Sequence, residues 1–377
     1  MRRLLGAIAD YFRECDKILI LLAAAASSYG CLAVYSATNY FGGTRQFITQ
    51  AGAMILGIIA AIVVSGIDYR KLAKWWPVLA VVSIVPVILT FYVGYAPAGT
   101  DDKAWLALPG GIYFQPAELL KLAFIITFST HLNKVRDRIN QIKYLLPACI
   151  HGALPVLLIH FQGDDGTALI FAVMVIAMLA AAGLKARYFV IAFTAVLIML
   201  PIIYFLIMNE AQQMRVLSMF DLEDDLLGAD WQQWRARIAM AGGGFFGQGF
   251  LNGQLVQKGN IPEGYNDFIF ASIGEEFGFF GCLIVVALLA GICLRILYIA
   301  RNANDDLGSF ICIGYFAMLG AQAIVNIGMC ISILPVIGIT LPFFSAGGSS
   351  LACLLLGLGP VLSVYMNRNS RTIYLRD

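Results

Sequence analysis

Residues 17–38 read KILILLAAAASSYGCLAVYSAT, and no charged side chain follows Lys17 in this stretch. About 20 consecutive apolar residues, wound as a helix, cross the roughly 30 Å hydrocarbon core of a bilayer. The chain has 377 residues, of which 60% are hydrophobic and only 13% are charged, and similar stretches recur along its whole length. This composition predicts an all-α integral membrane protein and excludes an ordinary soluble domain.

The apolar stretches predict about ten transmembrane helices in a single polytopic membrane domain, residues 1–377, with no soluble domain appended. The first stretch is long, is flanked by charge and lacks a small-residue cleavage site, so we expect a retained helix and not a signal peptide. The predicted spans are 17–38, 46–66, 75–95, 117–132, 144–160, 166–184, 188–208, 268–294, 309–334 and 345–366.

Lys and Arg are concentrated in alternate connections between these spans, and such an excess marks the cytoplasmic side. The basic side carries Arg2, Arg3, Arg13, Lys17, Arg70, Lys71, Lys74, Lys134, Arg136, Arg138, Lys143, Lys185, Arg187, Arg295, Arg301, Arg368, Arg371 and Arg376. Both termini are therefore predicted to be cytoplasmic. The long connection between the seventh and eighth helices, residues 209–267, is predicted to be extracytoplasmic.

This outer loop is too long to be structureless in a compact domain, so we expect short or re-entrant helices within it. Its cations are candidates for binding an anionic group, and they are Arg215, Arg235, Arg237 and Lys258. The glycine-rich centre GGGFFGQG, residues 242–249, could bring backbone amides close to a phosphate. The alternative is that these glycines let helices and loops pack closely at the membrane surface.

The stretch GYNDFIFASIGEEFGFFG, residues 264–281, places three acids at the start of an apolar span. Burying a carboxylate there costs several kcal/mol unless it is stabilised, so each acid needs a physical reason. Asp267 is a candidate functional acid, with helix capping as the alternative. On a continuous helix Glu275 would lie about 12 Å deeper than Asp267, and we predict that it lines a cavity. Glu276 would point nearly opposite to Asp267 and is predicted to pair with a neighbouring helix.

Other polar residues interrupt the remaining spans. Glu118 and Lys121 stand three residues apart on one helix face, a spacing that predicts an ion pair within the membrane. Asp164 and Asp165 precede a span, where one acid would cap the helix and the second could be a solvated bystander or a cation ligand. Residues 333–351 contain prolines and glycines that break the helix, as is tolerated where a segment lines a cavity or is buried in protein.

Cysteine- or histidine-based metal sites and nucleic-acid binding find little support in the sequence. The eight cysteines form no CxxC pair and no extracytoplasmic cluster, and the three histidines are scattered. A disulfide framework or a zinc site is therefore not expected. We also expect no nucleic-acid partner.

Four stretches together resemble the shape, elongation, division and sporulation (SEDS) family. They are FQPAELLKLAF at 114–124, QGDDGTAL at 162–169, NDFIFASIGEEFGFFG at 266–281 and NIGMCISILPVIGITLPFFSAGGSSL at 326–351. They occur in the family's order over most of the chain. NIGM and DYRKL favour the elongation-type, RodA-like branch, whereas GITLPF is closer to the sporulation and division branches. The chain departs from the family's pattern in several places; Tyr265 and Asn266, for example, stand where the family commonly has His and Thr.

The resemblance implies a ten-span SEDS fold and peptidoglycan glycosyltransfer. The substrate would be lipid II, polymerised at the outer face of the cytoplasmic (inner) membrane of a bacterium, among membrane lipids and with a class B penicillin-binding protein as partner. The family's essential outer-loop aspartate falls on Asp267, and its helix Glu and Lys fall on Glu118 and Lys121. Ser349, in the last motif, is a further candidate for substrate binding.

The expected chemistry fits these residue types. A sugar hydroxyl attacks an anomeric carbon while polyprenyl pyrophosphate leaves, so the site needs a base and positive charge. Asp267 is the expected base, the loop cations are candidates for the pyrophosphate, and a divalent cation, Mg or Mn, held by acidic loop residues could share that task. The alternative functions are a lipid II flippase, since discontinuous helices and buried ions also suit alternating access, and a scaffold that recruits the penicillin-binding protein.

Overall fold

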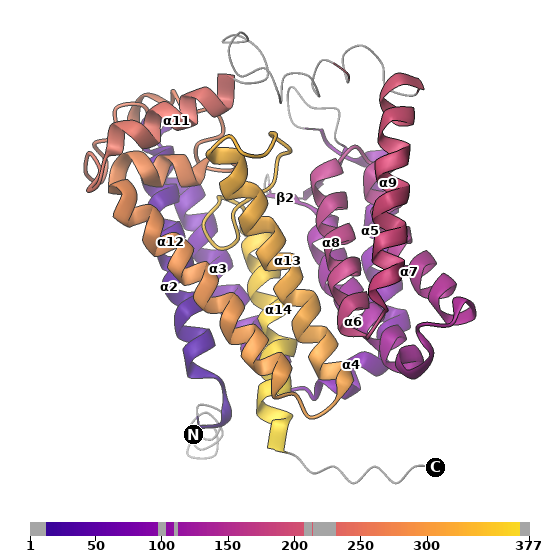
Figure 1. Cartoon of the computed structure of the whole chain (residues 1–377). Helices are drawn as coiled ribbons and strands as arrows, with labels where there is room; N and C mark the ends of the chain where they lie inside the picture. The colour runs from indigo at the N-terminus through magenta and orange to yellow at the C-terminus, as the bar shows by residue number, and fades with distance from the viewer. Residues whose placement is uncertain (1–12, 97–102, 109–111, 207–212, 214–230, 370–377) are drawn as a thin grey trace.

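The computed structural model describes residues 13–96, 103–108, 112–206, 213 and 231–369. Within them, one helix falls on each of the ten predicted spans (Figure 1). These are α2 (Lys17–Thr38), α3 (Thr44–Ser65), α5 (Trp76–Val93), α6 (Pro116–Val135), α7 (Ile142–Phe161), α8 (Asp165–Ala181), α9 (Ala186–Leu206), α12 (Ile269–Arg301), α13 (Asp306–Cys330) and α14 (Gly348–Met366). Eight are long and apolar enough to cross a membrane, and α6 and α8 are the other two. The predicted all-α membrane fold is confirmed.

Short elements connect the long helices. They are α4 (Tyr69–Lys74), α11 (Trp231–Gly243), an antiparallel hairpin of β1 (Leu106–Leu108) and β2 (Ile112–Phe114), and the 3-10 turns η1 (Asn39–Phe41), η2 (Arg136–Arg138), η3 (Val256–Lys258) and η4 (Asn367–Asn369). The helix α11 lies across one end of the bundle, which we call the outer end, and α2 begins and α14 ends at the opposite, inner end (Figure 1). The short helices expected in the long loop are thus present in the part of it that the structure describes.

The helices α13 and α14 form the centre of the bundle. In their most apolar 18-residue stretches, 67% of α13 and 72% of α14 are buried, against 17% of α5 and none of α9. Small residues bring α14 close to α3. A Cβ added at Gly57 would lie 2.7 Å from the Cβ of Leu355, and one added at Gly359 would lie 2.8 Å from the Cβ of Val64. Close backbone approach at glycine is the usual means of joining helices in a membrane, where apolar burial alone drives no association.

The helix α12 is longer than the predicted span and is interrupted at Gly278, whose φ of 66° and ψ of −163° are not helical. The chain between α11 and η3 packs into this break. The N–H of Phe279 donates to the carbonyl of Gly244 (2.8 Å), and the N–H of Gly249 donates to that of Glu276 (3.0 Å). A Cβ at Gly247 would lie 2.1 Å from the carbonyl oxygen of Glu276. The glycine-rich centre therefore serves close packing, and the amide of Gly249 binds a protein carbonyl.

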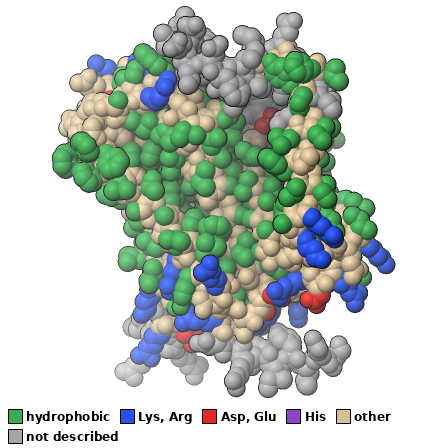
Figure 2. All heavy atoms as spheres, in the orientation of Figure 1, with side chains coloured by type: hydrophobic (Ala, Val, Ile, Leu, Met, Phe, Trp, Pro, Cys, Tyr) green, Lys and Arg blue, Asp and Glu red, His purple; other side chains and the backbone are tan. Residues whose placement is uncertain are grey.

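The inner end is tied by ion pairs between helices far apart in sequence. Arg295 of α12 binds Asp16, the N-cap of α2, with 2.7 Å between Nε and Oδ2. Arg70 of α4 binds Asp305 at the start of α13 with the same distance, and Arg136 binds Asp306. Figure 2 shows Lys and Arg side chains gathered towards this end, below an apolar band. This matches the charge pattern of the sequence, and the assignment of the end to the cytoplasm stays a prediction.

Candidate active site at the outer end

Asp267 lies just before α12, which begins at Ile269 with Phe268 as its N-cap, close to the predicted start of this span at residue 268. Its backbone carbonyl accepts a hydrogen bond from Nδ2 of Asn326 (2.7 Å) and a weaker one from Sγ of Cys330 (3.6 Å). The same amide of Asn326 donates to the carbonyl of Ile339 (2.6 Å), and Asn326 is fully buried. Asn326 therefore joins the Asp267 loop to the chain between α13 and α14.

The chain between α13 and α14, residues 331–347, contains most of the broken segment predicted at 333–351, whose last residues form the first turn of α14. Oγ of Ser345 donates to the carbonyl of Asn266 (2.7 Å) and accepts from the N–H of Leu341 (2.7 Å). The N–H of Ala346 donates to the carbonyl of Tyr265 (2.8 Å). These bonds hold the backbone of residues 265–267, while no hydrogen bond to the Asp267 carboxylate is found in the described part of the chain.

Asp164 approaches the same segment from α8. Its Oδ1 caps α8 by accepting the N–H of Thr167 (2.8 Å), and its Oδ2 accepts from Nε2 of Gln115 (3.0 Å), which precedes α6. A Cβ added at Gly166 would lie 2.4 Å from the carbonyl oxygen of Ile337. One added at Gly338 would lie 3.8 Å from Oδ2 of Asp267. The start of α8 and the Asp267 carboxylate therefore both face residues 337–338.

The carboxylates of the site affect one another. Burial raises the pKa of Asp267 from its ordinary value of 3.8 to about 7, and the charges of Glu263 and Asp164 add to the rise. Burial also raises the pKa of Asp164, against the opposing effects of its bonds to Thr167 and of the Lys121 charge. A carboxyl group with a pKa near neutrality can take up and release a proton under physiological conditions.

The predicted ion pair is present on α6. Nζ of Lys121 lies 2.9 Å from Oε1 of Glu118, and the two side chains are 1% and 5% exposed. Because its charge acts on Asp164, the pair belongs to the same neighbourhood as the two acids. Asp267, Asp164, Glu118 and Lys121 are thus brought together from three separate parts of the sequence.

The two glutamates of α12 have different partners, Glu275 in the outer loop and Glu276 on the neighbouring helix α2. Both oxygens of Glu275, which is 1% exposed, accept backbone N–H groups, those of Leu255 and Val256, at 2.8 Å. We had expected Glu275 to line a cavity; its oxygens are committed to protein amides, so we assign it to holding the loop. Glu276 accepts from Oγ of Ser36 on α2 (2.7 Å), and this confirms that it pairs with a neighbouring helix.

The remaining predicted residues lie around the cluster or apart from it. Asp165 is exposed and binds Nδ1 of His160 (2.5 Å). Arg235 sits over the rings of Trp231 and Trp234, while Arg237 and Lys258 are exposed on the outer surface. Ser349 is partly buried in the first turn of α14. Arg215 lies outside the described residues.

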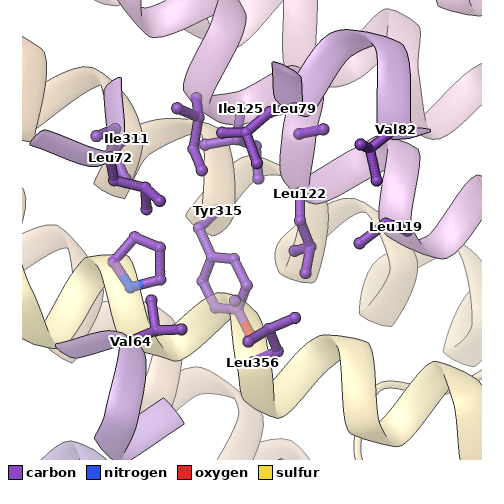
Figure 3. A pocket seen from close by; sticks show the side chains of 14 residues that line it. Val64, Leu72, Leu79, Val82, Leu119, Leu122, Ile125, Ile311, Tyr315 and Leu356 are labelled. Atoms are coloured by element: carbon purple, nitrogen blue, oxygen red, sulfur yellow. The ribbon is translucent and has the colours of Figure 1, made fainter. Parts of the chain in front are cut away.

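An apolar cavity of about 150 Å³ opens deeper in the bundle, away from the broken segment. Side chains of α3, α4, α5, α6, α13 and α14 line it (Figure 3). Two of them, Leu119 and Leu122 of α6, lie two residues before and one residue after Lys121 in sequence. The hydroxyl of Tyr315 donates to the carbonyl of Leu354 and so presents only its ring to the space. The cavity suits a hydrocarbon chain, and none of residues 333–351 lines it.

Sequence reasoning missed the residues that hold the acids. Asn326, Ser345 and Gln115 were within the stretches quoted above, but none was singled out. A buried asparagine in an apolar helix is itself a signal, because its amide must find partners. Which partners it finds depends on contacts 59 and 13 residues away.

A helical membrane bundle with a cluster of acids at one end is typical of a membrane enzyme or a transporter. Comparison with known proteins narrows it. A sequence model of the cell cycle protein family FTSW_RODA_SPOVE matches residues 16–370. The chain is 33% identical over 354 residues to peptidoglycan glycosyltransferase MrdB of Escherichia coli strain K12, covering 94% of each chain. It is 31% identical over 359 residues to a protein of Trichlorobacter lovleyi named "Probable peptidoglycan glycosyltransferase FtsW", covering 93% of each.

Solved structures agree. One chain of a solved structure, described as "Structural coordination of polymerization and crosslinking by a peptidoglycan synthase complex", is 28% identical in sequence to this protein. The two superpose with a TM-score of 0.81, covering 94% of this chain and 99% of that chain. The Rod shape determining protein RodA of Thermus thermophilus is 26% identical, with a TM-score of 0.69 over 94% and 98%. The protein therefore belongs to the FTSW_RODA_SPOVE family, which confirms the SEDS resemblance.

Proposed function

We propose that this protein is a peptidoglycan glycosyltransferase that polymerises lipid II into glycan strands at the outer face of the cytoplasmic membrane of a bacterium. Relatives carrying that activity in their names match more than nine-tenths of the chain. The observation that carries the mechanism is Asp267, a partly exposed carboxylate with a pKa of about 7 on a loop whose backbone is held by Asn326 and Ser345.

Asp267 acts as the general base. A base works best when its pKa lies near the operating pH, because it is then both largely ionised and basic enough to accept the proton. The acceptor hydroxyl gives its proton to Asp267 as its oxygen bonds to the anomeric carbon of the donor sugar. The bond from that carbon to the polyprenyl pyrophosphate breaks, and the pyrophosphate leaves with the electron pair.

Asp164, the acid that is not assigned as the base, also suits a divalent cation. Magnesium is commonly held by one or two carboxylates together with substrate phosphates. The described residues contain no group of three or more His, Cys, Asp or Glu side chains able to hold a metal on their own. The two acids repel each other electrostatically, and a cation would relieve that repulsion. Asp164 would hold Mg²⁺ or Mn²⁺, which would supply positive charge for the pyrophosphate leaving group, with the outer-loop cations as a second source.

The apolar cavity is the best place for part of a polyprenyl chain. Its lining is hydrocarbon, and two of its residues, Leu119 and Leu122, flank the buried Lys121 in sequence. A lipid substrate would thus occupy the bundle near α6 while its polar head reaches the outer acids. A crosslinking class B penicillin-binding protein is the proposed partner, as the solved synthase complex pairs polymerisation with crosslinking.

The flippase alternative is less well supported. Alternating access needs an inner end that opens and a site near the middle of the membrane. Here the inner end is tied by the ion pairs of Arg295, Arg70 and Arg136, and the acids gather at the outer end. These observations favour chemistry at the outer face.

The test is glycan-strand formation from lipid II by the purified protein together with a class B penicillin-binding protein. Wild type should form polymer, whereas Asp267→Ala and Asp267→Asn should form none while still binding the partner. Equal polymer from all three proteins would remove Asp267 from the chemistry. No polymer from any of them, accompanied by lipid II movement across liposomes, would support the flippase.

A further inference from the structure

Exposed cations gather at the inner end of the bundle, around the connections that lead into α7 and α9. We call these residues the inner basic patch: Lys134, Arg138, Lys143, Lys185 and Arg187. No ion pair joins any of them to an acid within the part of the chain that the structure describes. Asp137 is the only acid in the sequence of residues 134–143 and 183–188. The patch therefore presents a positive charge that the surrounding residues do not balance.

Asn140 joins the two connections that carry the patch. Its Nδ2 donates to the carbonyl of Gly183 (2.9 Å), and its Oδ1 accepts the N–H of Lys185 (2.9 Å). Its backbone carbonyl accepts from the hydroxyl of Tyr188 (2.9 Å). These three bonds hold the chain before α9 against the chain between α6 and α7. Cations that lie more than 40 residues apart in sequence are therefore fixed on one surface.

Two tyrosines position the arginines of the patch. Nη1 of Arg138 donates to the hydroxyl of Tyr144 (3.0 Å), and its guanidinium carbon lies 5.7 Å from the centroid of that ring. Nη2 of Arg187 donates to the hydroxyl of Tyr188 (3.1 Å), with 4.8 Å from its guanidinium carbon to the ring centroid. A guanidinium has five N–H groups, and its planar fork matches the oxygens of a phosphate. Each arginine is thus held in place and keeps donors for an anion.

An exposed apolar stripe on α7 begins at the patch. Ile142, Leu146, Ile150 and Leu154 recur every four residues, a spacing that keeps them on one side of the helix, and each is between 49% and 69% exposed. The most apolar 18-residue stretch of α9 is likewise unburied. Figure 2 shows the Lys and Arg side chains lying below the apolar band. The cationic surface therefore continues directly into a surface suited to hydrocarbon.

We propose that the inner basic patch binds an anionic phospholipid, whose phosphate accepts hydrogen bonds from Arg138 and Arg187 and whose acyl chains lie along the stripe of α7. Lys and Arg at the ends of membrane helices attract anionic headgroups, and basic pockets between such helices bind them. A soluble anion or an acidic protein segment would match the cations and leave the stripe uncovered. The proposal does not depend on the proposed function, because the patch lies at the opposite end of the bundle from Asp267.

The experiment uses the full-length protein in a neutral detergent and counts bound lipids by native mass spectrometry. Wild type is titrated with dioleoyl phosphatidylglycerol and, separately, with dioleoyl phosphatidylcholine, which has the same chains and no net charge. Phosphatidylglycerol should bind more tightly. The double variant Arg138→Gln, Arg187→Gln should weaken the first phosphatidylglycerol about 30-fold, which corresponds to about 1 kcal/mol for each cation near a membrane surface.

Two further variants separate a built site from general attraction. Lys17→Gln with Arg301→Gln removes the same charge from exposed positions on α2 and α12, on the other side of the inner end (Figure 1), and should leave phosphatidylglycerol binding as in wild type. Asn140→Ala changes no charge but releases the two connections from each other, and should weaken binding. Thermal unfolding of each variant in the same detergent without lipid checks that the fold is kept.

Several results would overturn the proposal. Equal weakening by the two double variants would show diffuse attraction to the whole inner end, and equal binding of the two lipids would show that charge plays no part. Displacement of phosphatidylglycerol by an equal concentration of glycerol 3-phosphate would assign the patch to a soluble phosphate. Displacement by an equal concentration of hexaglutamate peptide would assign it to an acidic protein segment.

Discussion

Replacing Asp267 by asparagine should make the protein more stable while it abolishes polymerisation. A rise in pKa from 3.8 to about 7 means that the folded protein holds the proton more tightly than the unfolded chain does. Stability is therefore lost as the pH rises from about 4 to about 7, and then stays constant. At about 1.4 kcal/mol per pKa unit, the charged carboxylate costs roughly 2–4 kcal/mol above pH 7, allowing for its partial exposure. Asparagine removes that cost. No hydrogen bond is lost with the carboxylate, because none to it is found among the described residues.

The assay is thermal unfolding in lipid nanodiscs at pH 5 and pH 8 for wild type, Asp267→Asn and the exposed control Asp165→Asn. The melting temperature of Asp267→Asn should exceed that of wild type by on the order of 3 °C at pH 8, given the unfolding entropy of a chain of this size. The gain should be at least halved at pH 5, where the folded wild-type carboxyl is already protonated. A variant that is less stable than wild type, or whose gain does not depend on pH, would refute the assignment of a raised pKa to the Asp267 carboxyl.

Three further results are expected. Asn326→Asp should lower kcat about 100-fold with little change in KM, because a carboxylate cannot donate the two hydrogen bonds that hold the Asp267 loop. Gln322→Ala, one turn away on α13, should leave both kcat and KM unchanged. Steady-state rates at several lipid II concentrations distinguish the two variants. Lys121→Met alone should destabilise the protein by about 3–5 kcal/mol by leaving Glu118 buried and unpaired, and adding Glu118→Leu should recover most of that loss in denaturant unfolding. Glu275→Ala should speed protease cleavage in the loop before α12, since two backbone amides lose their acceptor, and an unchanged cleavage rate would contradict its assigned role.

The sequence predicted the helices well because each span is decided by local composition. The continuous apolar run and the loop charges were enough to place α2, α13 and α14 to within a few residues. The prediction for α12 was less accurate, since its break at Gly278 arises from the packing of a distant loop. A glycine in a helix permits non-helical backbone angles, and only the tertiary contacts show that the helix is interrupted there.

The sequence indicated the charged residues of the candidate site but not the residues that hydrogen-bond to the loop around them. Asp267, Glu118 and Lys121 stood out because charges are rare in membrane spans. Glu275 is predicted to line a cavity, but its oxygens accept the amides of Leu255 and Val256, whose approach to α12 no local pattern indicates. Asn326 and Ser345 act through backbone carbonyls, which every residue has, so no residue pattern identifies the partners they choose.

The backbone of Asp267 is fixed by Asn326 while its carboxylate is bonded to nothing in the described part of the chain. For a small-molecule inhibitor this arrangement is favourable, because no protein contact has to be displaced before the acid is engaged. An amine or amidine reaching Asp267 and Asp164 together would meet two acids that repel each other, and would hold both in their ionised forms. A neutral substrate mimic would gain none of that attraction. An inhibitor would therefore need a positive charge to prefer this enzyme over enzymes that have a single, hydrogen-bonded acid.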